Sequence, residues 1–313
     1  MIEDATRRTV ASNQLARSPF GEVTGDALAG AVLSRAMAQA RAGHAGSEAL
    51  DLHGPQPRRL EVTASPLPDG GVVAVLVDAT ERRRLDAVRR DFIANVNHEL
   101  RTPIGALGVL AEALSGQRDQ ATLDRLAGRI SMEVDRARAL IEDLLEFSRV
   151  EADLQRTREP VALADVVEMA SARVSASAEQ KGVHLDLPDR AGLPTLVGDR
   201  EQLVTAVANL LDNAVKYSEA GTTVRVTVSS EDEAVVIAVT DEGIGIPARD
   251  LDRIFERFYR VDAARDRRTG GTGLGLAIVR HVATNHGGTV SVRSQEGMGS
   301  TFTLRLPSMS GSS

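Results

Sequence analysis

The strongest constraint on the fold is a helical repeat of apolar residues in the middle of the chain. Such residues recur every three or four positions from Leu85 to Leu114, and again from Leu123 to Val150. This spacing places them on one side of an α-helix. Ser115 and Gly116 interrupt the pattern between the two segments. The sequence therefore predicts two long amphipathic helices that form an antiparallel hairpin.

A single hairpin would leave the apolar stripe of both helices exposed. A second copy of the chain could bury the stripe in a four-helix bundle, so we predict a homodimer. The alternative is a monomer in which the hairpin packs against neighbouring parts of the same chain.

Composition excludes several functions. The 313 residues are enough for roughly two to three domains. Lys and Arg number 37 against 44 Asp and Glu, and the resulting net charge of −7 argues against nucleic acid as a partner. The chain has no Cys, which excludes disulfides, thiolate metal sites and cysteine nucleophiles.

The sequence predicts no membrane-spanning segment and no signal peptide. No run approaches the roughly 20 apolar residues of a spanning helix. The first ten residues are charged and lack an apolar core. We therefore expect the chain to lie in the cytoplasm, although it could be the inner portion of a longer, membrane-anchored protein.

The patterns divide the chain into four parts, and the predicted fold class is multidomain α+β. Residues 1–80 predict a small α/β module, and residues 81–155 the helical hairpin. Residues 156–308 predict an α/β sandwich, and residues 309–313 a Ser-rich, disordered tail.

Individual elements follow from local patterns. In the first part we expect a strand near 8–12, a helix over 28–42, and strands over 60–66 and 72–78 around the turn PDGG. In the third part we expect helices over 163–178, 199–217 and 274–285. Strands are expected there over 183–187, 224–229, 234–240, 290–294 and 301–306. Thr80 and Asp199 are candidate helix caps.

One histidine lies on an unusual side of the first long helix. At about 100° per residue, His98 falls opposite the apolar stripe and should face solvent, where a neutral imidazole is a nucleophile. Glu99 could orient the ring or take its proton, and Thr102 lies one turn further on the same face. Pro103 should bend the helix beside His98. An exposed helical histidine is by itself usually an ordinary surface residue.

A second group of polar residues ends a helix of the α/β part, in the string NLLDNAVKY at 209–217. Asn209 and Asn213 are four residues apart and share a face. Their carboxamide oxygens suit Mg²⁺ bound to nucleotide phosphates. Lys216 offers positive charge for a phosphate, and Tyr217 offers a flat surface for a base or ribose. The alternative is an asparagine pair that caps the helix beside an ordinary surface lysine.

Two glycine-rich strings follow, DEGIGIP at 241–247 and GGTGLGL at 270–276. Asp241 ends a strand, where its carboxylate can accept a hydrogen bond from an exocyclic amine such as that of adenine. Glycines allow the backbone to approach a ligand, and glycine-rich turns at helix starts present N–H groups to phosphates. The glycines that we expect at the site are Gly243, Gly245, Gly271, Gly273 and Gly275.

An arginine-rich segment separates the two strings. FERFYR at 255–260 is followed by a loop at 261–269 that contains Arg265, Arg267 and Arg268 and has little apolar content. We expect this loop to be a mobile lid over a nucleotide. Arg260, held against the aromatic residues before it, is the candidate contact to the terminal phosphate.

The string FIANVNHELRTP at 92–103 resembles the phosphoacceptor box of sensor histidine kinases, with Asn97 where Ser is commoner. The order of the asparagine, aspartate–glycine, phenylalanine and second glycine strings resembles the ATP-binding domain shared by histidine kinases and gyrase- or chaperone-type ATPases. The resemblance covers roughly residues 85–307 and implies a Bergerat-type sandwich. PIGA at 103–106, AEAL at 111–114 and HVATNH at 281–286 are most similar to actinobacterial phosphate-regulon sensor kinases.

The resemblance assigns roles to the quoted residues. Asn213 and Asn209 would serve Mg²⁺, Lys216 a phosphate, Tyr217 the nucleoside and Asp241 the adenine amine. The five glycines would line the site and its lid.

Residues 1–80 show a separate resemblance, to a sensor module. DATER at 78–82 is similar to the exit of a PAS sensor module into its signalling helix. Related kinases carry membrane helices before such a module, whereas its first strand begins here at Met1. A ligand of this module is not evident, and a Cys-linked flavin is excluded.

The implied activity is that of a two-component sensor histidine kinase. His98 would take the γ-phosphoryl group of ATP with help from Glu99, and then pass it to an aspartate of a response regulator. Glu99 and Thr102 also match the pattern for dephosphorylation of the regulator, with Thr102 positioning water. Transfer within one protomer and between protomers are both compatible with the sequence. The rival interpretations are an ATPase that uses ATP as a conformational clamp, and an inactive scaffold that regulates by dimerising.

Overall fold

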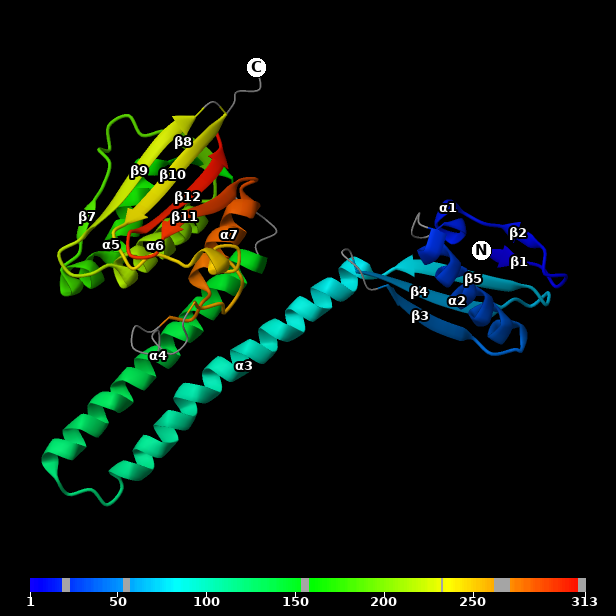
Figure 1. Ribbon diagram of the computed structural model, residues 1–313, viewed down its shortest axis with the longest axis horizontal. Coiled ribbons are helices and arrows are strands. Elements are labelled where there is room, and N and C mark those ends of the chain that lie inside the picture. The colour runs from blue at the N-terminus through cyan, green and yellow to red at the C-terminus, as the bar shows by residue number, and fades with distance from the viewer. Residues whose placement is uncertain (19–22, 53–56, 153–157, 232, 262–270, 309–313) are drawn as a thin grey trace. The chain divides into compact units, whose positions relative to one another are not determined.

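The structure is a computed structural model, and it describes residues 1–18, 23–52, 57–152, 158–231, 233–261 and 271–308 (Figure 1). The chain divides into two compact units, Met1–Ala94 and Asn95–Ser313. No helix of these ranges is both long and apolar enough to cross a membrane.

The first unit is a five-stranded antiparallel sheet with helices against it. The strands β1 (Ile2–Glu3), β2 (Thr9–Ala11), β3 (Gly46–Leu52), β4 (Arg58–Pro66) and β5 (Val72–Asp78) are arranged in the order β2-β1-β5-β4-β3. Helices α1 (Gln14–Arg17) and α2 (Val23–Arg41) complete the unit. Alternate residues of β4 are buried against α2, as expected for a sheet with one covered face. The strands expected over 60–66 and 72–78 are confirmed.

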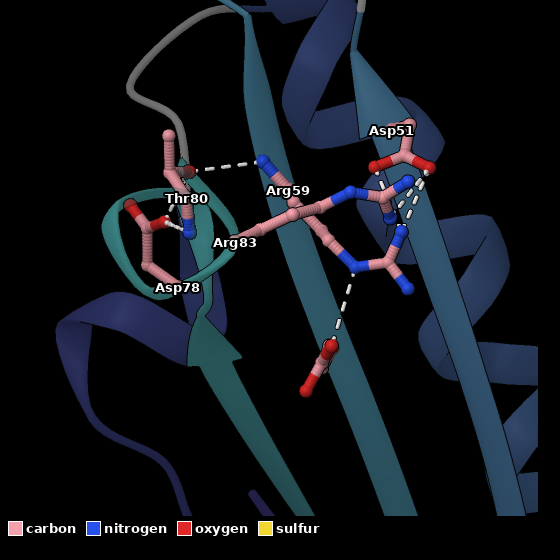
Figure 2. A network of polar contacts seen from close by, with 6 residues as sticks. Asp51, Arg59, Asp78, Thr80 and Arg83 are labelled. Atoms are coloured by element: carbon pink, nitrogen blue, oxygen red, sulfur yellow. Dashed lines mark hydrogen bonds and ion pairs between the residues drawn. The ribbon is translucent and has the colours of Figure 1, made fainter. Parts of the chain in front are cut away.

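A polar network fixes the start of the next helix to this sheet (Figure 2). The guanidinium of Arg59 contacts both carboxylate oxygens of Asp51, at 2.8 and 3.0 Å, and Arg83 reaches the same carboxylate at 3.4 Å. The expected cap at Thr80 is different in the structure. Its N–H donates to Asp78 at 2.9 Å, and its hydroxyl accepts from the Arg59 backbone N–H at 2.9 Å. Thr80 is therefore the first helical residue, and the preceding aspartate provides the acceptor.

Two long helices form the predicted hairpin, α3 (Thr80–Leu114) and α4 (Gln120–Ala152). The turn begins where the sequence predicts it, and Gly116 has a φ of +94°, a conformation that favours glycine. Pro103 lies inside α3, which continues as a helix on both sides of it. The side chains of Leu110 and Leu140 are buried, whereas Ile104 is 61 % exposed.

A sheet of mixed direction forms the centre of the C-terminal α/β domain. Its strands are β7 (His184–Asp186), β9 (Thr223–Glu231), β10 (Ala234–Asp241), β11 (Thr289–Gln295) and β12 (Gly299–Pro307), in the order β11-β12-β10-β9-β7. β7 runs parallel to β9, and the other pairs are antiparallel. β6 (Glu159–Ala162) and β8 (Thr195–Gly198) form a separate pair that the sequence analysis did not predict.

The helices α5 (Leu163–Lys181), α6 (Arg200–Tyr217) and α7 (Gly275–Asn285) form the second layer, and a short 3₁₀ turn, η1 (Ala248–Asp250), follows β10. The core between the layers is aliphatic, with Leu203, Leu211, Ile237, Ile278 and Leu304 fully buried. The predicted α/β sandwich and the multidomain α+β fold class are confirmed.

The start of α6 is held by two side chains. Asp199 Oδ1 accepts from the N–H of Gln202 at 3.1 Å, so the predicted cap is confirmed. The buried His286 ring accepts from the Asp199 N–H through Nε2, at 3.0 Å. Its Nδ1 lies 2.8 Å from the Val282 carbonyl oxygen and therefore carries the proton. This histidine is a neutral structural residue.

Candidate functional site

A cavity of about 490 Å³ lies in the second unit, between α6, the turn after β10, the start of α7 and one side of the hairpin. Most of the residues predicted for the site line it. They are Asn209, Asn213, Lys216, Tyr217, Asp241, Gly245, Arg260, Gly271, Gly273 and Gly275, together with Glu99. Gly243 does not line the cavity but adjoins Asp241, and neither His98 nor Thr102 is among the lining residues that the structure describes.

The carboxylate of Asp241 is the buried acid of the cavity. The residue is 5 % exposed, and its Oδ1 accepts from the N–H groups of Gly243 at 2.9 Å and Ser300 at 3.2 Å. The register of β10 and β12 places Asp241 opposite Ser300. Burial raises the pKa of this carboxyl, and the two backbone hydrogen bonds oppose the shift. In the described part of the chain, Oδ2 accepts no hydrogen bond and is available to a ligand.

Two glycines after Asp241 permit close backbone contacts. A Cβ at Gly243 would lie 2.6 Å from the Tyr217 carbonyl oxygen. A Cβ at Gly245 would lie 2.0 Å from the Gln295 carbonyl oxygen, and its φ is +70°. Larger residues would push this turn away from α6 and β11, so the glycines set the width of the cavity at this end.

The polar end of α6 forms the opposite wall. Asn209 and Asn213 lie one turn apart, as predicted, and the Asn209 amide donates to the Thr205 carbonyl oxygen at 3.0 Å. A Cβ at Gly275 would lie 2.6 Å from Asn209 Oδ1. The absent methyl group therefore leaves room beside a carboxamide oxygen, and a hard cation suits such an oxygen.

Lys216 and Tyr217 continue this wall. The ammonium of Lys216 lies 5.2 Å from the centroid of the Tyr217 ring. Asp212, which the sequence analysis did not select, also lines the cavity, and burial raises the pKa of its carboxyl while Lys216 opposes the shift. A Cβ at Gly271 would lie 2.0 Å from Lys216 Nζ. The Lys216 ammonium therefore lies directly against the backbone of the second glycine string.

The aromatic segment after η1 contains a further arginine, Arg253, in contact with an aromatic ring. Arg253 lies over the ring of Tyr259, at 4.3 Å from its centroid, and the Tyr259 hydroxyl donates to Asp250 at 2.7 Å. Phe255 packs edge-on against Phe302, with 6.5 Å between ring centroids. The predicted lid with Arg265, Arg267 and Arg268 lies outside the described residues, as does the tail at 309–313.

His98 lies on the exposed side of α3, as the helical geometry predicts. The Thr102 hydroxyl donates to the His98 backbone carbonyl at 3.3 Å, which places both residues on the same face. Glu99 is half-buried, and its carboxylate lies 4.0 Å from the guanidinium of Arg136 on α4. The acid beside His98 is therefore held by a residue of the second helix.

The hairpin supplies one wall of the cavity, which the sequence analysis missed. Arg136, Leu140 and Asp143 of α4 line it together with Glu99 and Pro103 of α3. The three α4 residues are spaced by four and three positions and share one face of that helix. This spacing was visible in the sequence, but the domain that it faces was not.

The fold and the cavity define a class of protein in which an ATPase domain is joined to a phosphoacceptor hairpin. Residues 198–310 match the family of histidine kinase-, DNA gyrase B- and HSP90-like ATPases, and residues 88–153 match the His Kinase A (phospho-acceptor) domain. The chain belongs to the sensor histidine kinases.

Similar proteins agree with this assignment. The sensor-like histidine kinase SenX3 of Mycolicibacterium smegmatis is 46 % identical over 75 % of this chain and 62 % of its own length. The sensor histidine kinase WalK of Bacillus subtilis is 38 % identical over 76 % of this chain and 39 % of its own length. The chain thus spans less than two thirds of the length of these curated relatives.

Solved structures show the same fold. Full-length ShkA in complex with AMPPNP has a TM-score of 0.51 and 29 % identity, over 71 % of this chain and 47 % of that one. The Acinetobacter baumannii histidine kinase AdeS has a TM-score of 0.51 and 27 % identity, over 68 % of this chain and 98 % of that one.

The second glycine string provides a matched pair of substitutions. Gly273 has a φ of +74°, and an added Cβ would lie 2.7 Å from the Phe258 carbonyl carbon, which cannot move freely. At Gly271 an added Cβ would meet the flexible end of Lys216. We expect Gly273→Ala to destabilise the ATPase domain by about 1–3 kcal/mol in calorimetric unfolding. Gly271→Ala should cost clearly less, and equal losses would contradict this account of the loop.

Proposed function

We propose that the chain phosphorylates itself on His98 with ATP and then passes the phosphoryl group to an aspartate of a response regulator. The observation that carries the proposal is an exposed histidine in a matched phosphoacceptor hairpin, within the same compact unit as a cavity that holds a buried aspartate.

The cavity residues fit ATP. The free Oδ2 of Asp241 would accept the adenine amine, and Tyr217 would contact the nucleoside. Lys216 and Arg260 would contact phosphates. Gly243, Gly245, Gly271, Gly273 and Gly275 would let the backbone approach the nucleotide. The close approaches that these glycines permit support this assignment.

Mg²⁺ would be held by the carboxamide oxygens of Asn213 and Asn209. The space beside Asn209 Oδ1, which a Cβ at Gly275 would fill, fits an oxygen-ligated ion. Such an ion supplies charge neutralisation on the phosphates.

Transfer to His98 is a substitution at phosphorus. An N–P bond forms, the P–O bond to ADP breaks, and the imidazole proton goes to Glu99. Catalysis of such a step is mainly positioning and stabilisation of charge. In the arrangement that the structure describes, Glu99 contacts Arg136 and lines the cavity, whereas His98 does not line it. Transfer therefore requires either that the ATPase domain moves toward His98 of its own chain or that the His98 of a second copy enters the cavity.

His98→Gln should abolish labelling from γ-labelled ATP, because the glutamine amide cannot accept a phosphoryl group, while leaving ATP affinity within about twofold. His184→Gln, at another exposed histidine, is the control. The wild-type label should be acid-labile and base-stable, which separates a kinase from a clamp-type ATPase or an inactive scaffold. A His98→Gln chain labelled to the wild-type level would show that another residue is the acceptor.

Asp241→Asn should weaken ATP binding roughly 10- to 100-fold, because a hydrogen bond to a charged group contributes about 1.5–3 kcal/mol. Glu242→Gln, at the exposed neighbour, should bind normally. Because burial raises the Asp241 pKa, the carboxylate is protonated at a higher pH than an exposed aspartate. As the pH is lowered, the ATP affinity of the wild-type protein should therefore begin to fall at a higher pH than that at which an exposed aspartate is protonated. Asp241→Asn should lack this fall. The same pH dependence of ATP affinity in both proteins would contradict the assignment of Asp241 to the adenine amine.

The same face of α3 supports exchange with a response regulator. His98 and Thr102 are both exposed there, and Thr102 would position water against the regulator's aspartyl phosphate with the help of Glu99. The histidine kinase ThkA, whose structure was solved in complex with the response regulator protein TrrA, shares the fold at 18 % identity and a TM-score of 0.59.

We propose a homodimer held by the hairpin. Apolar side chains on both helices are largely exposed in the single chain, namely Ile93, Ile104, Val109, Met132, Val134, Ile141 and Leu145. Residues 93 and 104 share one side of α3, and residues 134, 141 and 145 share one side of α4. A second copy would remove from water the side of α3 that carries residues 93 and 104 and the side of α4 that carries residues 134, 141 and 145, at about 25 cal/mol per Å².

Ile104→Asp should convert the dimer into a monomer, because a carboxylate would be buried in the bundle. Arg118→Asp introduces the same side chain in the turn of the hairpin and should leave the dimer intact. Molar mass from light scattering at tens of micromolar gives the result. A monomeric wild-type chain would favour the alternative, in which the hairpin packs against neighbouring parts of the same chain.

We also propose that residues 1–80 are a PAS-type sensor module, residues 81–155 the phosphotransfer hairpin and residues 156–308 the catalytic domain, in a cytoplasmic protein similar to phosphate-regulon kinases. The sheet with one covered face supports a sensor module. The network of Asp51, Arg59 and Arg83 ties this module to α3 and gives an input a mechanical route into the helix.

A further inference from the structure

A set of contacts outside the nucleotide-binding residues holds α4 against the ATPase domain. We call Asp143, Glu146, Phe147, Val150 and Glu151 the docking face, because their spacing places them on one side of α4. The Phe147 ring is the centre of this face and is 1 % exposed.

Partners of the docking face come from three segments of the ATPase domain. The guanidinium of Arg257 lies 4.6 Å from the centroid of the Phe147 ring, and the His281 ring lies 6.1 Å from it. Thr205 donates to Glu146 at 2.9 Å, and Arg257 contacts Glu151 at 3.2 Å. The Asn285 amide donates to the Val150 carbonyl at 3.1 Å. The docked arrangement is therefore specific rather than a loose apposition.

Asp143 differs from the other residues of the docking face because it also lines the cavity. Its Oδ2 accepts from the hydroxyl of Thr272, in the second glycine string. Burial raises the Asp143 pKa, with Glu146 and Asp212 acting in the same direction and Thr272 and Lys216 in the opposite one. A carboxyl group thus stands where the docking contact and the phosphate-binding residues meet.

A triphosphate in the cavity would act against this arrangement in two ways. It would compete with Asp143 for the positive charge of Lys216, and its own negative charge would repel the carboxylate in a partly desolvated space. It would also compete for Thr272, which lies between two glycines that line the cavity.

We propose that Asp143 is a positioning residue that makes docking of the ATPase domain on α4 and binding of a nucleoside triphosphate mutually antagonistic. The Asp143–Thr272 contact holds the domain in a position in which His98 lies outside the cavity wall, and a bound triphosphate breaks this contact and frees the domain for transfer. This inference rests on the proposed binding of ATP. Because such coupling is reciprocal, docking through Asp143 lowers the affinity for triphosphate by the same factor.

Binding measurements test the antagonism first. Asp143→Ala removes both charge and acceptor, and Asp143→Asn removes the charge but keeps an acceptor for Thr272. Glu142→Gln is the matched control, because Glu142 is the adjacent residue, 69 % exposed, and pairs with Arg138. We expect both Asp143 variants to bind a fluorescent ATP analogue about 5- to 10-fold more tightly, the corresponding ADP analogue less so, and adenosine unchanged.

Distance measurements supply a readout that does not depend on activity. The chain has no native Cys, so spin labels can be placed at Arg118→Cys in the hairpin turn and Ser229→Cys on β9. In doubly labelled chains diluted with unlabelled protein, the wild-type distance distribution should be narrow without nucleotide and broad with a non-hydrolysable triphosphate. Asp143→Ala should be broad under both conditions, and Glu142→Gln should behave as wild type.

The outcomes separate the two proposals. A wild-type chain that binds no triphosphate would overturn the proposed function, and the antagonism with it. A wild-type chain that binds triphosphate, together with Asp143 variants whose affinity and distances are unchanged, would overturn the antagonism alone. Asp143→Asn keeps this test decisive if Asp143→Ala unfolds.

Discussion

The geometry of a single α-helix is the constraint on which the proposed phosphoacceptor, His98, depends. Ile93 and Ile104 are eleven residues apart, which is close to three full turns, so they share one side of α3. His98 is five residues from Ile93 and therefore lies about 140° around the helix. In the single chain both isoleucines and His98 are exposed, and a partner helix that covers the isoleucines would lie on another side of α3 than the imidazole. The proposed dimer and access to the histidine therefore use different sides of the same helix.

In the ATPase domain, the fold brings polar groups from distant segments of the chain together around one cavity. The register of β10 and β12 places Asp241 opposite Ser300, 59 residues further along the chain. The turn that follows can then approach β11 only because Gly245 lacks a Cβ, which would lie 2.0 Å from the Gln295 carbonyl oxygen. Backbone proximity, rather than a particular side chain, therefore determines where glycine is needed.

Features with local causes could be predicted from the sequence. The exposure of His98 follows from helical periodicity, and the cap at Asp199 follows from its place before an apolar repeat. The structural role of His286 could not be predicted, because its partner Asp199 is 87 residues away. Arg136 and Asp143 were missed for the same reason, since their meaning depends on a domain that docks on α4. The strands β6 and β8 were missed because each pairs with the other at a distance in the sequence, which a local pattern does not reveal.

The proposed antagonism gives a reason why α4 carries an acid, and not an apolar residue, at position 143. An apolar residue would add to the contact that Phe147 already makes, and would do so without the cost of removing a carboxylate from water. The strength of that contact would not depend on whether a ligand occupies the cavity. A carboxylate close to Lys216 and Thr272 stabilises docking only while no stronger anion occupies their side of the cavity. The buried charge of Asp143 therefore makes docking responsive to nucleotide, and a tenfold response corresponds to only about 1.4 kcal/mol of coupling.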